Sequence, residues 1–271
     1  MPELPEVETV KLGLSKNLET LGRIEQVKLF RKDLRFEFPK KMKNALEGQK
    51  ILSISRRAKY LVFETQDYVW LCHLGMTGAW RQETGDHQKQ PHDHFRVSFE
   101  SGRSWVYRDP RRFGYMDLIK KGSSIVWFEH LGPEPLESSF SSEYLFQKSR
   151  NKKAPIKNFI MDQKVVVGVG NIYASEALYM ARVKPSKASH RLTRKQAELL
   201  VSSIKMVLKK ALKSGGSSIR DYKNADAEMG YFQQSLKVYD RAGKPCFSCK
   251  KPIKKITQAG RSTFYCSNCQ V

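Results

Sequence analysis

The chain has 271 residues, and its 49 Lys and Arg against 27 Asp and Glu give a formal net charge of +22. Such a basic excess predicts a polyanionic partner, because neutralising phosphates releases condensed counterions. Nucleic acid is the first candidate, ahead of an acidic protein or a membrane surface. A hydrophobic content of 40% excludes a disordered basic tail.

The N-terminus has no apolar signal-peptide core, and the chain contains no apolar run of about 18 residues that could form a transmembrane helix. We therefore expect a cytoplasmic protein without a membrane partner. Disulfides are rare in that compartment, so clustered cysteines indicate metal binding.

The first predicted element is a helix over residues 5–18. Pro5 suits the first helical position. Val7, Val10 and Leu14 recur at spacings of three and four, which gives the helix one apolar stripe.

The region from about residue 24 to 119 is typical of β-strands. Its short runs are rich in β-branched and aromatic residues and are separated by turn-formers. This pattern predicts an α+β fold with an N-terminal antiparallel β-sandwich or barrel. The predicted strands are Ile51–Ser55, Tyr60–Glu64, Tyr68–Leu74, Phe95–Phe99, Trp105–Tyr107 and Tyr115–Ile119.

A break at Gly132-Pro133-Glu134-Pro135 suggests a domain boundary. We expect an N-terminal domain over residues 1–133, a helical domain over 134–235 and a compact module over 236–271. Helices are predicted in the second domain at 142–151, 155–162, 172–182 and 193–213, followed by a long loop over 214–234.

The C-terminal module carries two Cys-x-x-Cys pairs, and 16 residues separate Cys249 from Cys266. This spacing predicts a β-hairpin zinc finger in which one structural ion is held by Cys246, Cys249, Cys266 and Cys269. The alternative is a pair of disulfides, which the expected compartment disfavours. Arg261 follows Gly260 at the expected hairpin tip, where it could reach a phosphate.

The N-terminal segment Met-Pro-Glu-Leu-Pro-Glu could supply a nucleophile. Removal of Met1 would leave the secondary amine of Pro2, and an α-amino group has a pKa of about 7.7–8.0. Such an amine can attack an aldehyde-level carbon and form a cationic iminium that promotes elimination. Glu3 and Glu6 lie within one turn and could transfer protons. The same residues are also ordinary residues of a helix start.

Several segments together resemble the formamidopyrimidine-DNA glycosylase family, and the resemblance extends from end to end. Its motifs are MPELPEVETV, Lys59-Tyr60-Leu61, His73-Leu74-Gly75-Met76, His92-Asp93-His94, Asp109-Pro110-Arg111-Arg112-Phe113-Gly114, Gly168-Val169-Gly170-Asn171-Ile172-Tyr173 and the four-Cys finger. The resemblance implies a helix–two-turn–helix motif in the second domain. It also implies a monomer acting on double-stranded DNA that contains an oxidised purine, within the bacterial nucleoid.

The resemblance further implies catalytic roles for Pro2, Glu3, Lys59 and Arg261. Pro2 would attack C1′ of the damaged nucleotide, and Glu3 would act as acid and base at the deoxyribose. Lys59 would lie near the scissile phosphates, and Arg261 would contact phosphate.

Other matched residues would contact DNA. Met76, Arg111 and Phe113 would fill the void left by an extruded base, and the glycines around Met76 indicate an exposed turn. Asn171 suits a helix N-cap next to a phosphate. The remaining DNA-contacting candidates are His73 and His92 near phosphate and Lys157 near the damaged base.

The loop over residues 215–232 corresponds to the family's lesion-recognition loop. The implied reaction is excision of 8-oxoguanine and formamidopyrimidines followed by β,δ-elimination. Two alternatives stay open, namely an endonuclease VIII-like glycosylase for oxidised pyrimidines and a non-enzymatic zinc-finger DNA-binding protein. Leu4 and the Arg111-Arg112-Phe113 segment argue against the first.

Overall fold

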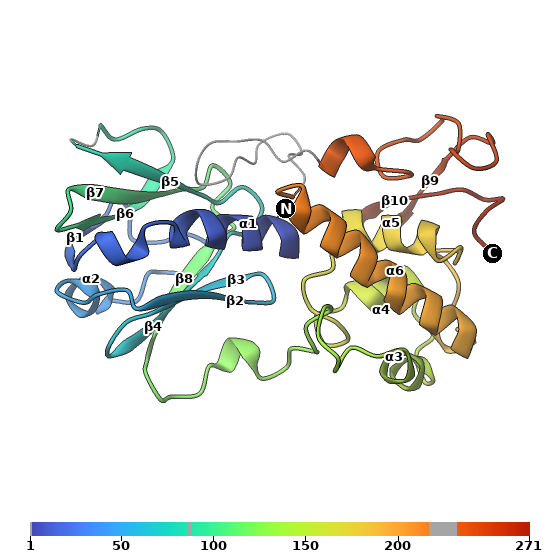
Figure 1. Ribbon diagram of the computed structural model, residues 1–271, viewed down its shortest axis with the longest axis horizontal. Helices are drawn as coiled ribbons and strands as arrows, with labels where there is room; N and C mark the ends of the chain where they lie inside the picture. Colours follow the sequence, from blue (N-terminus) through green and yellow to red (C-terminus); the bar gives the residue numbers. More distant parts are fainter. Residues whose placement is uncertain (1, 86–87, 217–231) are drawn as a thin grey trace. The chain divides into compact units, whose positions relative to one another are not determined.

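The computed structural model describes residues 2–85, 88–216 and 232–271. It divides into two compact units (Figure 1). Unit 1 comprises Met1–Phe128 and Gly215–Tyr231, and unit 2 comprises Glu129–Ser214 and Phe232–Val271. The predicted lesion-recognition loop lies largely outside the described residues, and the three-domain division at 133 and 235 stays a prediction.

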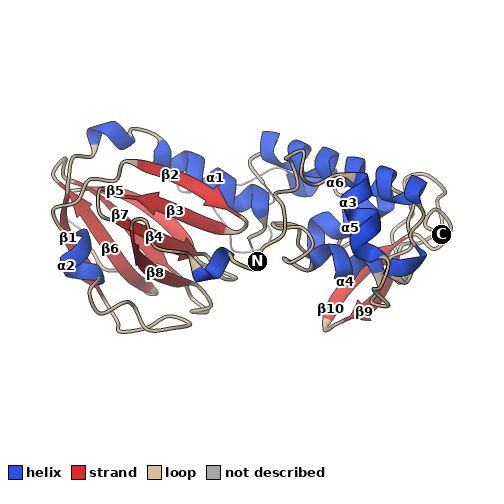
Figure 2. Ribbon diagram, turned by 90° about the horizontal axis from the view of Figure 1, so that it is seen from below, coloured by secondary structure: helices blue, strands red, loops and turns tan. Residues whose placement is uncertain are grey.

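Unit 1 contains two antiparallel sheets of four strands each, in the orders β1-β6-β7-β5 and β2-β3-β4-β8 (Figure 2). One apolar cluster draws side chains from both sheets and from the first helix, so the sheets face each other across a shared core. The predicted sandwich is confirmed. The strands are β1 (Ile24–Leu29), β2 (Ser53–Arg57), β3 (Tyr60–Glu64), β4 (Tyr68–His73), β5 (Ala79–Thr84), β6 (Asp93–Phe99), β7 (Arg103–Arg108) and β8 (Tyr115–Lys120).

The helices of unit 1 are α1 (Leu4–Ser15), α2 (Met42–Leu46) and the 3-10 turns η1 (Leu18–Thr20) and η2 (Val126–Phe128). Helix α1 begins one residue earlier than predicted, with Glu3 as its N-cap in a capping box with Glu6. It ends earlier as well, because Asn17 adopts the left-handed conformation with φ of 60°.

Unit 2 contains the four predicted helices, with ends that differ by a few residues. They are α3 (Ser142–Ser149), α4 (Ile156–Met161), α5 (Asn171–Met180) and α6 (Arg194–Lys213). Short 3-10 turns follow at η3 (Ser189–Arg191) and η4 (Phe232–Ser235), and a hairpin of β9 (Lys254–Gln258) and β10 (Arg261–Tyr265) lies near the C-terminus. The helices and the hairpin confirm the predicted α+β class.

No helix in the described part of the chain combines the length and the apolar character that a bilayer crossing requires. The longest, α6, exposes lysines along its polar side, and its apolar side is buried in unit 2.

Candidate active site and DNA-contacting residues

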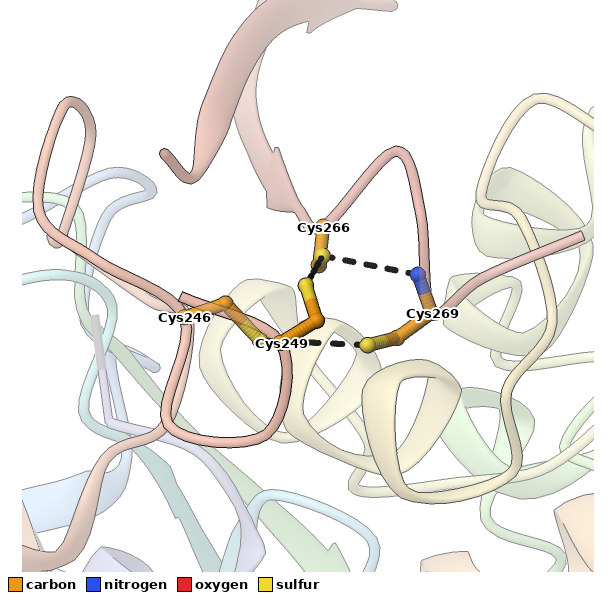
Figure 3. Close-up of side chains that lie close together, drawn as sticks. All are labelled: Cys246, Cys249, Cys266 and Cys269. Carbon is orange, nitrogen blue, oxygen red and sulfur yellow. Dashed lines mark hydrogen bonds between the residues drawn. The ribbon is translucent and has the colours of Figure 1, made fainter. Parts of the chain in front are cut away.

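Four cysteine thiols point toward one another from the loops on either side of the β9–β10 hairpin (Figure 3). The Sγ atoms of Cys246, Cys249, Cys266 and Cys269 all lie within 4.8 Å of one another. The distance is 3.9 Å from Cys246 to Cys269 and 3.4 Å from Cys249 to Cys266. Tetrahedral zinc with Zn–S bonds of about 2.3 Å places its sulfurs about 3.8 Å apart, so the four thiols fit one ion with no open coordination position.

The zinc finger is attached to the rest of unit 2 by specific polar contacts. The hydroxyl of Tyr179, on α5, lies 3.3 Å from Cys246 Sγ and 2.9 Å from Ser248 Oγ. The buried carboxamide of Gln270 accepts the N–H of Cys266 at 2.8 Å and donates to the Val183 carbonyl at 3.0 Å. These contacts fix the finger against the helices.

The N-terminal candidates lie at the beginning of α1. Pro2 is buried, and the Glu3 side chain is only 2% exposed. The Glu3 N–H donates to Glu6 Oε2 at 2.9 Å, which fixes the backbone that carries both Pro2 and Glu3. Gly216 approaches the same turn, since a Cβ on it would lie 3.0 Å from Glu6 Oε1. A carboxyl group is thereby held beside the residue whose amine would begin the processed chain.

Lys59 lies in the tight turn between β2 and β3. Its neighbour Ala58 has φ of 54°, and Lys59 is 8% exposed. Arg56 holds this turn against α1, because its guanidinium donates to Glu8 Oε2 at 2.8 Å and to the Ala58 carbonyl at 2.8 Å. Sequence analysis missed Arg56 and Glu8, which lie 48 positions apart.

His73 lies close to Lys59 because β3 and β4 pair Tyr60 with His73. The imidazole stacks on Tyr115, with ring centroids 5.1 Å apart and an interplanar angle of 15°. Burial lowers the pKa of His73 to about 4, and the cations Lys59 and Arg35 act in the same direction. Nδ1 accepts the Gly75 N–H at 3.0 Å, so the neutral ring carries its proton on Nε2 and can donate from there.

Two loops that carry the predicted void-filling residues are joined through Asp109. This residue is fully buried, and its carboxylate accepts the Thr77 hydroxyl and the Gly114 N–H, the latter at 2.8 Å. Thr77 Oγ1 in turn accepts the Arg111 N–H at 3.1 Å. The turn containing Met76 and the loop containing Arg111 are thus positioned together. Neither Asp109 nor Thr77 was assigned a role from sequence.

Glycine is required in these loops by close approach. A Cβ on Gly75 would lie 2.3 Å from Gly114 N, and a Cβ on Gly114 would lie 1.9 Å from the Tyr107 hydroxyl oxygen. The interpretation of the glycines as marks of an exposed turn was wrong, because Gly75 and Gly78 are both buried where the two loops meet.

The three void-filling candidates nevertheless reach the surface of unit 1. Met76 is half-buried, Arg111 is exposed, and Phe113 is 43% exposed. The Arg111 guanidinium lies 4.9 Å from the centroid of the Phe113 ring. An exposed apolar side chain and an exposed cation side by side suit contact with both bases and phosphates.

Family models for three successive parts of one enzyme match the chain. The "Formamidopyrimidine-DNA glycosylase N-terminal domain" matches residues 1–116, the "Formamidopyrimidine-DNA glycosylase H2TH domain" matches 131–223, and the "Zinc finger found in FPG and IleRS" matches 243–271. A formamidopyrimidine-DNA glycosylase of Bdellovibrio bacteriovorus is 48% identical over 271 residues, which is 100% of both chains. The chain belongs to the formamidopyrimidine-DNA glycosylase family.

Other members are similar over the same length. The formamidopyrimidine-DNA glycosylase of Vibrio parahaemolyticus is 43% identical over 100% of both chains. A Lactococcus lactis FPG mutant, solved in complex with a Fapy-dG containing DNA, superposes with a TM-score of 0.92 at 37% identity and 99% coverage of both chains. The Lactococcus lactis protein in complex with an abasic site containing DNA gives a TM-score of 0.90 at the same identity and coverage.

The H2TH region of this glycosylase family member differs from the sequence prediction at the beginning of helix α5. Helix α5 begins at Asn171, and Gly170 is its N-cap in an extended conformation. The N-cap prediction for Asn171 was therefore wrong by one residue. Gly170 can fill that position because glycine is also favoured there.

Lys157 is placed in the interior of unit 2, with 1% of its surface exposed. Its Nζ donates to Asn171 Oδ1 at 2.5 Å, to Thr263 Oγ1 at 2.7 Å and to the Ser262 carbonyl at 3.1 Å. An ammonium has three N–H donors, and each has an acceptor here. Helix α4 directs the side chain toward these acceptors, and the contact between Lys157 and a damaged base stays a prediction.

Arg261 is the first residue of β10 and is exposed at the hairpin tip, as expected for a phosphate contact. The two turn residues, Ala259 and Gly260, have φ of 46° and 70°, which is typical of a type I′ turn.

The two histidines of the His-x-His segment have different surroundings. His92 is exposed in a left-handed conformation with φ of 72°. His94 is 7% exposed, and its Nε2 lies 2.9 Å from the Asp109 carbonyl. Within the described ranges, neither joins a group of three or more potential metal ligands. His92 therefore stays a candidate for phosphate contact only.

Glu176 is a buried acid whose structural role was not predicted from the sequence. It is buried on α5, and its carboxylate accepts the backbone N–H groups of Lys237, Val238 and Tyr239 at 2.8–2.9 Å. Burial raises the pKa of Glu176 although these three hydrogen bonds favour the charged form. The acid joins the segment that precedes the finger to α5. The signal available in the sequence was a charged residue within the stretch Ile172–Leu178, which carries no other charge.

Proposed function

We propose that this protein is a bifunctional DNA glycosylase and AP lyase that removes oxidised purines, namely 8-oxoguanine and formamidopyrimidines, from duplex DNA. The observation that carries the proposal is the full-length similarity to named formamidopyrimidine-DNA glycosylases. It is supported by the Pro2-Glu3 pair at the beginning of α1.

The first step uses the amine of Pro2 after removal of Met1. The nitrogen lone pair attacks C1′ of the damaged nucleotide, and the bond from C1′ to the base breaks, so the base leaves with a proton. Ring opening of the deoxyribose then gives an iminium between Pro2 and C1′. A secondary amine forms a permanently cationic iminium, which withdraws electrons from C2′.

The second step is elimination. Loss of a proton from C2′ expels the 3′ phosphate, and a further proton loss expels the 5′ phosphate. We assign these transfers to Glu3, and two features support the assignment: it is the neighbour of Pro2, and its burial removes it from bulk water. It would protonate the ring oxygen as the sugar opens, and the resulting carboxylate would then accept the proton that C2′ loses.

The DNA backbone would be held by residues of both units. Lys59 and the Nε2–H of His73 would contact phosphates near the reacting sugar, and His92 would contact phosphate from its exposed loop. In unit 2 the candidates are Asn171 and Arg261. These contacts carry no sequence information, which suits an enzyme that must act at any position in the genome.

Met76, Arg111 and Phe113 would enter the duplex where the damaged nucleotide is extruded. Extrusion costs a few kcal/mol of lost stacking and pairing. The apolar side chains would offset part of that cost, and the Arg111 guanidinium would hydrogen-bond the orphaned base.

Zinc would be held by the four cysteines and would stabilise the hairpin that presents Arg261. The small apolar cluster around Val238, Ile253 and Phe264 is insufficient to fold this module alone. We further propose that the protein works as a monomer on double-stranded DNA in the bacterial cytoplasm, at the nucleoid.

Borohydride trapping on a duplex with 8-oxoguanine opposite cytosine tests the proposal. Reduction of the iminium should give a covalent adduct that peptide mapping assigns to Pro2. Glu3→Gln should bind this duplex and process it slowly. Glu19→Gln, which removes the same charge from an exposed site, should behave as the parent.

The two alternatives give different outcomes in the same assay. Faster trapping on an oxidised-pyrimidine duplex of the same sequence would support an endonuclease VIII-like enzyme. Absence of any adduct from a protein that lacks Met1 and binds the duplex would support a non-enzymatic DNA-binding protein.

A further inference from the structure

The buried ammonium of Lys157 connects three elements of unit 2. Lys157 lies on α4, Asn171 is the first residue of α5, and Ser262 and Thr263 belong to β10. Helix α5 contacts both α4 and β10, which Figure 1 shows close together. The three hydrogen bonds of Lys157 span 14 to 106 positions in sequence.

The Asn171 carboxamide is oriented by this arrangement. Its Oδ1 accepts from Lys157, which directs Nδ2 toward the Ser262 carbonyl at 3.0 Å and the Tyr239 hydroxyl at 3.4 Å. If the amide were flipped, its NH₂ group would oppose the ammonium. Lys157 therefore determines which side of Asn171 presents its donor.

The same ammonium fixes the strand that carries Arg261. It binds the carbonyl of Ser262 and the hydroxyl of Thr263, the two residues that follow Arg261. A cavity of about 210 Å³ borders this place, and its lining includes Lys157, Asp162, Gln258 and Arg261. The ammonium thus lies directly behind the surface on which Arg261 is exposed.

We infer that Lys157 is a positioning residue that keeps Asn171 and Arg261 in one register, so that both engage the DNA backbone together. This inference rests on the proposed function. Burying an ammonium costs desolvation free energy, which its hydrogen bonds must offset. A methionine of similar length would fill the space without ordering Asn171 or β10.

The inference predicts a specific pattern of energetic coupling. Lys157→Met should weaken binding to a duplex containing a tetrahydrofuran abasic-site analogue about tenfold. In a protein that already carries Asn171→Ala and Arg261→Ala, Lys157→Met should weaken binding to the same duplex by less than about twofold. The contacts that Lys157 organises are already absent from that protein. A residue that merely stabilises unit 2 would cost the same factor in both backgrounds.

The salt dependence of binding supplies a second readout. Each lost phosphate contact lowers the slope of log Kd against log salt by about 0.9. Lys157→Met should lower the slope by an amount that corresponds to about one or two lost phosphate contacts, although Lys157 itself is buried. Lys209→Met removes the same charge from an exposed site on α6 and is the matched control.

Thr263→Val covers the case in which the lysine variant does not fold. It removes one acceptor and keeps the ammonium, so binding should weaken about two- to threefold in the parent. As with Lys157→Met, the effect should be smaller in the protein that carries Asn171→Ala and Arg261→Ala. Zinc content should match the parent for both Lys157→Met and Thr263→Val, because neither change touches the four cysteines.

Two outcomes would overturn the inference. If Lys157→Met weakens binding by the same factor in the parent and in the double-alanine protein, Lys157 only stabilises the core of unit 2. A cost seen with an 8-oxoguanine duplex but not with the abasic analogue would indicate direct contact with the base. A parent protein that fails to bind damaged DNA or to give the borohydride adduct would instead refute the proposed function.

Discussion

Replacing Asp109 by asparagine tests how the two void-filling loops are held together. The carboxylate accepts two hydrogen bonds in a fully buried site, one from the Thr77 hydroxyl and one from the Gly114 N–H at 2.8 Å. Asparagine has almost the same shape but only one acceptor oxygen. Its NH₂ group must therefore face one of these two donors.

The structure sets the size of the effect. If the NH₂ group faces Gly114, a buried N–H loses its acceptor, at a cost of about 1–3 kcal/mol. If it faces Thr77, the hydroxyl can rotate away, but its oxygen already accepts the Arg111 N–H and its own proton is left without this acceptor. Loss of a charge-assisted hydrogen bond costs about 1.5–3 kcal/mol. We expect the free energy of unfolding to fall by about 2–3 kcal/mol.

Tryptophan fluorescence during urea unfolding is the suitable assay. The chain has 4 tryptophans, and Trp70, Trp80, Trp105 and Trp127 all belong to unit 1. The signal therefore reports this unit, and the midpoint should fall by about 1 M at an unchanged slope. Thr77→Val should shift it in the same direction by less. Glu19→Gln should leave it in place, and an unshifted Asp109→Asn midpoint would refute the coupling of the loops.

The remaining predictions concern backbone approach, pH and metal. Gly114→Ala should lower the stability of unit 1 by more than about 2 kcal/mol in the same assay, because the new Cβ would lie 1.9 Å from the Tyr107 hydroxyl oxygen; wild-type stability would show that the loops can separate without cost. The pKa of His73 is lowered to about 4 in the folded protein, so its contribution to stability is present above about pH 6.5 and is lost, by up to about 3 kcal/mol, as pH falls toward 4. NMR titration of the imidazole checks this, and a folded-state pKa near 6.5 would contradict it. Chelation of zinc, or Cys249→Ser, should abolish DNA binding and leave the tryptophan signal of unit 1 native; retained affinity would show that the finger is dispensable.

Much of this protein could be predicted from local patterns. The Cys-x-x-Cys spacing identified the zinc ligands, because each pair is a tight turn whose geometry depends on few residues. Apolar periodicity found the four helices of unit 2 and most strands of unit 1. Strands β1 and β5, which lie at the two edges of one sheet, were not predicted individually. Strand β5 is polar apart from Ala79 and Trp80, so its sequence lacks a clear apolar pattern.

Helix ends were less certain because several residue types satisfy the same cap. Gly170 and Asn171 are both acceptable N-caps, and only the extended backbone of Gly170 decided between them.

The sequence by itself determined the composition of the candidate site, namely a proline whose amine is the proposed nucleophile, an adjacent acid, basic residues proposed to contact phosphate and a four-cysteine metal centre. Only the tertiary structure decided which distant residues meet. Asp109 joins two loops, and Lys157 turned out to be an internal link between α4, α5 and β10. A side chain's exposure depends on which elements pack over it, and no local pattern contains that information.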